Sequence, residues 1–149
     1  MLSLVAAAVA LAAVPPKGKY TGQTSQGRSV HIRINKHHNI PDGGFVVHWL
    51  ADNCKANPNA SWGPEGSSNS GTIDVKSDGS FRRSGHYNSH VKGYTGHISI
   101  SGKGQFTTKT QANGTFKVKV RVVKNSTGNQ VDTCRASVTW SVVRALPGG

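Results

Sequence analysis

The sequence predicts an all-β protein, an antiparallel β-sandwich or barrel of about eight or nine short strands with one disulfide. Polar and apolar residues alternate in several segments, as they do in a strand with one buried face. Turn-forming pairs such as Asp78-Gly79 and Asn113-Gly114 stand between these segments. No window keeps the 3.6-residue apolar period of an amphipathic helix, so helices are not expected.

Three segments carry the alternation most clearly: residues 28–35, 115–123 and 136–144. In the first of them, Val30, Ile32 and Ile34 share one face of the expected strand. Shorter strands are expected at residues 19–24, 45–50, 71–76, 80–87, 96–101 and 104–110. Residues 51–70 show no alternation and are rich in Gly, Pro, Ser and Asn, so a long loop is expected there.

Apolar residues are scarce enough to raise the question of disorder. After residue 14, Leu, Ile, Val and Phe together supply 25 of 135 residues, about 19%, which is a share typical of disordered chains. A disordered chain, however, has no reason to keep its apolar residues on one face of three separate segments. The alternation therefore predicts a folded domain with a thin core.

The first 14 residues hold no charge and are rich in Ala, Val and Leu, like the core of a secretory signal peptide. We expect residues 1–14 to be a signal peptide cleaved near Ala12–Val14, and residues 15–149 to form one secreted β domain, extracellular or associated with the cell wall. A retained apolar anchor or a spurious start is the alternative. No second apolar run reaches the roughly 18 residues of a membrane span, so no span is expected in the mature form.

The chain has two cysteines, Cys54 and Cys134, and neither belongs to a Cys-x-x-Cys pair or a zinc-ligand spacing. An exported protein meets an oxidising environment, so one structural disulfide is the expected state. Closing a loop of about 80 residues contributes roughly 4.5 kcal/mol to the free energy of unfolding in the chain-entropy model. A pair of free thiols or a catalytic cysteine is the alternative.

Two segments resemble the opening and the ending of an uncharacterised family of small secreted all-β proteins from actinobacteria. They are Tyr-Thr-Gly-Gln-Thr-Ser-Gln-Gly at 20–27 and Cys-Arg-Ala-Ser-Val-Thr-Trp at 134–140, with the segments at 78–81, 93–102 and 113–116 between them. The resemblance spans nearly the whole chain after the leader. It implies a secreted β-sandwich with one disulfide, and it implies no activity. The many histidines and the segment 53–70 depart from the family pattern.

The basic surface is the strongest functional signal in the sequence. The chain has 18 Lys and Arg against 6 Asp and Glu, a formal net charge of +12. Lys117, Lys119 and Arg121 are expected about 6.6 Å apart on the outward face of one strand, and Arg33 takes an outward position in another. These four residues are the candidate anion-binding site. Further cations would enlarge it if their strands are neighbours: Lys36, Arg82, Arg83 and Arg144. The alternative is that the charges only keep an open sheet edge soluble.

A face of this charge attracts polyanions in general. The expected partners are an anionic cell-wall polymer or a glycan, with nucleic acid bound only nonspecifically through charge. Sequence-specific recognition of nucleic acid needs a groove-reading helix or an RNP-like aromatic pattern, and the sequence has neither.

The expected loop at 51–70 supplies a second candidate site. Trp62 lies there near Asn59 and Glu65, a set that can stack on a sugar ring and hydrogen-bond to it. Packing of Trp62 over the disulfide is equally compatible with the sequence. Trp49 and Trp140 take inward positions in their strands and are expected in the core.

The sequence carries no catalytic motif, and no Gly-x-Ser-x-Gly elbow is present. We therefore expect a protein that is not an enzyme and has no cofactor and no metal. His86 and His90 would stand about 13 Å apart along a strand, too far to share one ion, and the adjacent His37 and His38 point in different directions. The histidines are accordingly expected to be solvated.

Together these features predict a secreted, monomeric, non-catalytic binding protein of the cell envelope. One alternative is a secreted hydrolase acting on a polysaccharide, with a site assembled from Asp52, Glu65 and nearby histidines. The other alternative is a purely structural secreted protein.

Overall fold

The computed structural model describes residues 14–146, so the expected signal peptide lies outside the described residues except for Val14. Eight antiparallel strands form one sheet in the order β4-β3-β2-β1-β8-β7-β6-β5. The strands are β1 (Gly18–Thr24), β2 (Ser29–Ile34), β3 (Phe45–Ala51), β4 (Trp62–Ser68), β5 (Ser80–Val91), β6 (Tyr94–Phe106), β7 (Gln111–Lys124) and β8 (Gln130–Arg144). The predicted all-β class is confirmed.

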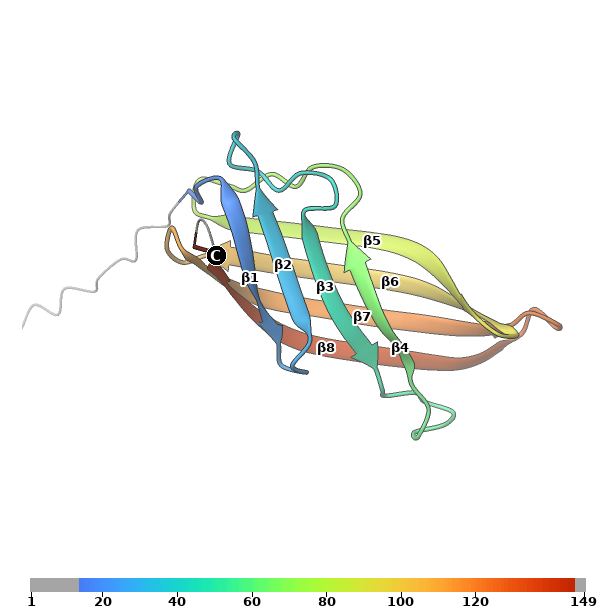
Figure 1. Cartoon of the computed structure of the whole chain (residues 1–149). Helices are drawn as coiled ribbons and strands as arrows, with labels where there is room; N and C mark the ends of the chain where they lie inside the picture. Colours follow the sequence, from blue (N-terminus) through green and yellow to red (C-terminus); the bar gives the residue numbers. More distant parts are fainter. Residues whose placement is uncertain (1–13, 147–149) are drawn as a thin grey trace, which may run out of the picture.

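The sheet curls into a half-barrel with two layers (Figure 1). The short strands β1–β4 form one layer and cross over the long strands β5–β8, which extend beyond them at one end. The two layers join through the pairing of β1 with β8, while β4 and β5 are the two ends of the sheet. Between residues 14 and 146 there is no helix of the length and apolar character that a membrane span requires.

An aromatic cluster fills the space between the layers. Phe45 of β3 has its ring centroid 5.5 Å from those of Phe81 and Trp140, and 6.3 Å from that of Phe116. Because these partners come from β5, β7 and β8, one side chain of the short-strand layer contacts three strands of the other layer. Trp49 and Trp140 are both buried, which confirms their predicted core positions.

Inward-facing glycines in the long strands make room for these rings. A Cβ atom at Gly104 would lie 2.5 Å from Trp140 Cζ2 and 2.7 Å from Phe81 Cζ. At Gly96, a Cβ atom would lie 2.6 Å from Trp62 Cζ2. The thin core is therefore well filled, because bare backbone on one layer faces large aromatic rings.

Replacing Gly104 with alanine is expected to lower the free energy of unfolding by about 1–3 kcal/mol, because the added methyl group overpacks the aromatic cluster. Gly85→Ala is the matched control, since a Cβ atom there meets its nearest neighbour, Ile100 Cγ1, only at 3.8 Å. The control should change stability by less than about 0.5 kcal/mol. Urea denaturation of both variants checks this, and equal stability of the two would contradict the packing argument.

Side chains close the open side of the half-barrel between β4 and β5. Tyr87 of β5 donates to Glu65 Oε2 of β4 at 3.0 Å, and its hydroxyl lies 2.7 Å from Ser67 Oγ. Trp62 Nε1 donates to Ser89 Oγ at 2.9 Å and to Glu65 Oε1 at 3.0 Å. Burial raises the pKa of Tyr87 to about 12, so this hydroxyl keeps its proton and remains the donor to Glu65. These bonds take the place of a backbone ladder.

The disulfide Cys54–Cys134 is present and links residues 80 positions apart. It ties the segment after β3 to strand β8. The same segment is also held by backbone bonds, from Lys55 N to Thr133 O at 2.9 Å and from Ala56 N to Asp132 Oδ1 at 2.8 Å. The predicted single disulfide is confirmed.

Several strand predictions need correction. The expected loop at 51–70 contains strand β4, and the expected strand at 71–76 contributes only one bridge, from Ile73 to Ile40. Of the two short strands expected at 96–101 and 104–110, residues 96–101 and 104–106 belong to one continuous strand, β6, and residues 107–110 form the connection to β7. The expected turn at Asn113-Gly114 lies within β7. The strands of the long-strand layer are also longer than predicted, since β5–β8 have 12 to 15 residues each.

Candidate anion-binding face

The outward positions of β5–β8 are occupied almost entirely by polar side chains. Alternate residues of each strand point away from the core, so the four long strands present one broad outer face. Six exposed cations lie on it, and we call this surface the basic face. They are Arg82 on β5, Lys103 on β6, Lys117, Lys119 and Arg121 on β7, and Arg135 on β8.

The strand register sets like charges directly opposite each other on this face. Arg82 pairs with Lys103 across β5 and β6, and Lys119 pairs with Arg135 across β7 and β8. Directly opposite side chains have Cβ atoms about 4.5–5.5 Å apart, and like charges at that distance destabilise the sheet. A bound anion would relieve both repulsions.

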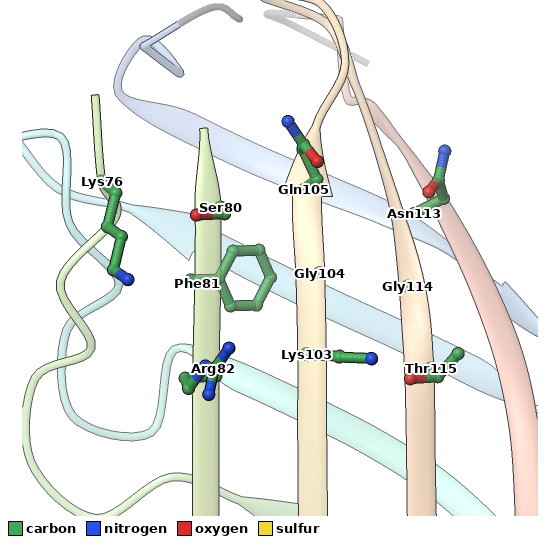
Figure 2. Close-up of a pocket in the computed structure, with 10 residues that line it drawn as sticks. All are labelled: Lys76, Ser80, Phe81, Arg82, Lys103, Gly104, Gln105, Asn113, Gly114 and Thr115. Carbon is green, nitrogen blue, oxygen red and sulfur yellow. The ribbon is translucent and has the colours of Figure 1, made fainter. Parts of the chain in front are cut away.

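A shallow depression of about 320 Å³ lies at one end of the basic face (Figure 2). Its floor includes the cross-strand pair Gly104 and Gly114, where no side chain covers the backbone. Lys103 reaches from β6 toward Thr115 on β7, and Arg82 stands on β5. The depression is open and polar, so it suits an extended ligand lying across the strands rather than an enclosed small molecule.

Acidic residues are kept away from the basic face. Asp132 is the only acid within β5–β8, and its Oδ1 accepts hydrogen bonds from Ala56 N and Thr133 N, each at 2.8 Å. Asp78 lies in the turn before β5, where it accepts from Ser80 N at 2.9 Å and from Ser80 Oγ at 2.5 Å; the bonds from Ser80 lower its pKa. The cations of the four strands therefore have no carboxylate interleaved among them.

Arg33 does not join the three predicted residues of β7. It lies on β2 in the other layer, separated from β7 in the sheet order by β1 and β8, and pairs there with Lys19 of β1. Its Nη2 donates to the carbonyl oxygen of Asp42 at 3.4 Å. The predicted set of four cations is thus divided between two outer faces, with Lys117, Lys119 and Arg121 on one and Arg33 on the other.

The three residues proposed as a glycan contact do not form an open sugar site, although Trp62 and Glu65 are hydrogen-bonded to each other. Trp62 is the first residue of β4 rather than part of a loop, and it is only 6% exposed. Both oxygens of Glu65 accept hydrogen bonds inside the β4–β5 closure, and Asn59 is exposed in the preceding turn. In this arrangement the Trp62 indole is a packing element, and a sugar ring has no open indole face to stack on.

The positions of Asp52 and Glu65 bear on the hydrolase alternative, and the clustering of Cys, His and acidic side chains bears on metal binding. Glu65 is held by Trp62 and Tyr87, while Asp52 is exposed beyond the end of β3. Among residues 14–146, one cluster of potential metal ligands is found, Cys54, Asp132 and Cys134. Both of its sulfur atoms are joined in the disulfide and so are not thiolate ligands.

The histidines fall into separate groups. His31 and His48 lie on the outer face of the short-strand layer, with ring centroids 6.3 Å apart. His86, His90 and His97 point outward on the long-strand layer, where each Nδ1 lies within 3.1 Å of a neighbouring side-chain oxygen. His86, His90 and His97 are thus neighbours of the basic face.

Comparison of the chain with protein-family models, with curated proteins and with solved structures finds no match. The resemblance to a secreted actinobacterial family therefore stays a prediction.

Three cations of the basic face were outside the predicted set of four: Lys103 and Arg135, which were not predicted at all, and Arg82, which was expected to join only if its strand was a neighbour. Their outward phase is readable, because each stands beside an inward residue in an alternating segment. What the sequence does not contain is the strand order, which places Lys103 and Arg135 on the two strands beside β7 and Arg82 one strand further, on β5.

Proposed function

We propose that this protein is a non-catalytic module that binds anionic polymers through the basic face. The observation that carries the proposal is the presence of two like-charge cross-strand pairs, Arg82–Lys103 and Lys119–Arg135, on a face without carboxylates. Such pairs weaken a sheet. Their cost is offset when a polyanion lies across the four strands and neutralises both pairs at once.

An extracellular site of action fits this chemistry. The disulfide Cys54–Cys134 is consistent with an oxidising compartment, and anionic polymers are abundant at the cell envelope. Nucleic acid would bind by the same charges without sequence preference, because the outward positions of β5–β8 carry no exposed aromatic row for base stacking.

Binding of the purified domain to heparin, single-stranded DNA and uncharged dextran across a salt series tests the proposal. With six phosphate contacts, the logarithm of the association constant for single-stranded DNA should fall with the logarithm of salt at a slope of about −4. That slope corresponds to a loss of affinity of roughly 300-fold between about 50 and 200 mM salt. Dextran should not bind, and absence of binding to both polyanions at the lower salt would refute the proposal.

A further inference from the structure

A second depression lies further along the basic face and is lined by two rows of side chains that run across the strands. Its volume is about 340 Å³. In the first row His86, Ser99 and Lys119 are successive cross-strand partners on β5, β6 and β7. In the second row Asn88, His97 and Arg121 are successive partners on the same strands. All six side chains line the depression.

From this arrangement we propose that the depression is a subsite for a phosphate group of the bound polymer. The inference rests on the proposed function and narrows it from anionic polymers in general to phosphate-bearing chains. Four side chains with cationic or imidazole groups surround the depression from three strands: His86, His97, Lys119 and Arg121.

The placement of these groups favours phosphate over carboxylate. Lys119 and Arg121 stand about 6.6–6.8 Å apart along β7, and the two histidines face them from β5 and β6. A phosphate within a chain has four oxygens arranged tetrahedrally, two of them charged and non-bridging and two bridging, so it can accept from groups on different strands. A carboxylate has two oxygens in one plane, so it can engage fewer of these donors at a time.

Hydrogen bonds within the sheet orient both imidazole rings. His97 Nδ1 lies 2.8 Å from Asn88 Oδ1 and donates to it, and His86 Nδ1 lies 3.1 Å from Ser99 Oγ. These contacts occupy the Nδ1 atoms and leave the Nε2 atoms available to a ligand. The Ser99 hydroxyl can donate to His86, whose Nε2–H then donates to phosphate in the neutral ring.

His97 differs from His86 in its protonation requirement. Because its Nδ1–H is used by Asn88, donation from Nε2 requires the doubly protonated ring. The charged and titratable groups near this ring are Arg121, directly opposite on β7, Lys119, diagonal on β7, and His86 and His90, diagonal on β5. Asp132, the only acid of β5–β8, is bonded on the inner side of the sheet. Phosphate binding should therefore take up a proton, and the affinity should be higher at pH 6 than at pH 8.

The test compares two polymers of matched charge, inorganic polyphosphate and poly-L-glutamate, in calorimetric titrations of the wild-type domain. At pH 6 we expect polyphosphate to bind at least tenfold more tightly than poly-L-glutamate. The double variant His86→Gln, His97→Gln should reduce this preference to below threefold, because it should weaken polyphosphate binding much more than poly-L-glutamate binding. It should also lose the pH dependence of polyphosphate binding.

The matched control is His31→Gln, His48→Gln, which removes one exposed and one half-buried histidine from the opposite outer face. The control should keep the full preference for polyphosphate. Equal binding of the two polymers by the wild-type domain, with normal salt dependence, overturns the phosphate subsite and leaves the proposed function standing. Binding of neither polymer overturns both, and a preference that persists in the His86/His97 variant overturns the subsite alone.

Discussion

Replacing both Cys54 and Cys134 with alanine is expected to lower the free energy of unfolding by about 4.5 kcal/mol. The cross-link spans 80 residues, and closing so long a loop removes much of the conformational freedom of the unfolded chain. A domain of this size has a total stability of roughly 5–15 kcal/mol, so the variant should be close to unfolding at 37 °C. Urea denaturation followed by fluorescence of the three tryptophans, all buried, measures the loss.

Wild-type protein unfolded in the presence of a reductant is the control for this prediction, since it loses the cross-link and keeps both side chains. Its stability should match that of the double alanine variant within about 1 kcal/mol. A total loss below about 1 kcal/mol would mean that the bonds from Lys55 N and Ala56 N hold the segment without the disulfide. At low temperature the folded variant should still bind polyanions, because both cysteines are buried on the inner side of the sheet.

The strands that could be predicted from the sequence are those with a regular apolar pattern. β2, β7 and β8 alternate strictly between buried and exposed residues, and so their faces were predicted correctly. Strand β4 has the sequence Trp-Gly-Pro-Glu-Gly-Ser-Ser, without alternating apolar residues. Gly and Pro are tolerated there because β4 is at the edge of the sheet, where one side of the backbone has no ladder partner.

The candidate site could be predicted only in part, for a related reason. The outward phase of Lys117, Lys119 and Arg121 follows from the inward phase of Val118 and Val120 within one segment. Whether Arg33 or Arg135 lies beside them depends on strand order, which results from pairing between distant parts of the chain. The sheet order sets Arg135 next to β7 and Arg33 in the other layer.

The curl of the sheet gives its two layers different roles. The short layer supplies Phe45 and Trp49 to the core and closes against β5 through Glu65 and Tyr87. Because the short-strand layer covers the inner face of β5–β8, the side chains on the outer face do not have to pack in the core. This separation allows a high density of charge on one surface without placing a charge in the core.

Neutralising the three cations of β7, in the variant Lys117→Gln, Lys119→Gln, Arg121→Gln, is expected to weaken binding of single-stranded DNA by at least about 100-fold at about 50 mM salt. With three contacts left on the basic face, the slope against salt should fall from about −4 to about −2. Affinity would then drop only about 20-fold between about 50 and 200 mM salt. The same salt series as for the wild-type domain measures both quantities.

The triple β7 variant should bind single-stranded DNA more weakly, but its folded state should be more stable than that of the wild-type domain. Removing the charge of Lys119 ends its repulsion of Arg135, so the free energy of unfolding should rise by a few tenths to about 1 kcal/mol. Lys19→Gln, Arg33→Gln, Lys36→Gln is the matched control, because it removes three exposed charges from the opposite side. If this control lost as much affinity as the β7 variant, binding would depend on net charge alone, and the basic face would have no special role. Both variants remove a like-charge cross-strand repulsion, Lys119–Arg135 or Lys19–Arg33, so both should gain stability. A loss of affinity confined to the β7 variant would show that its cations bind the ligand at a cost to the stability of the fold.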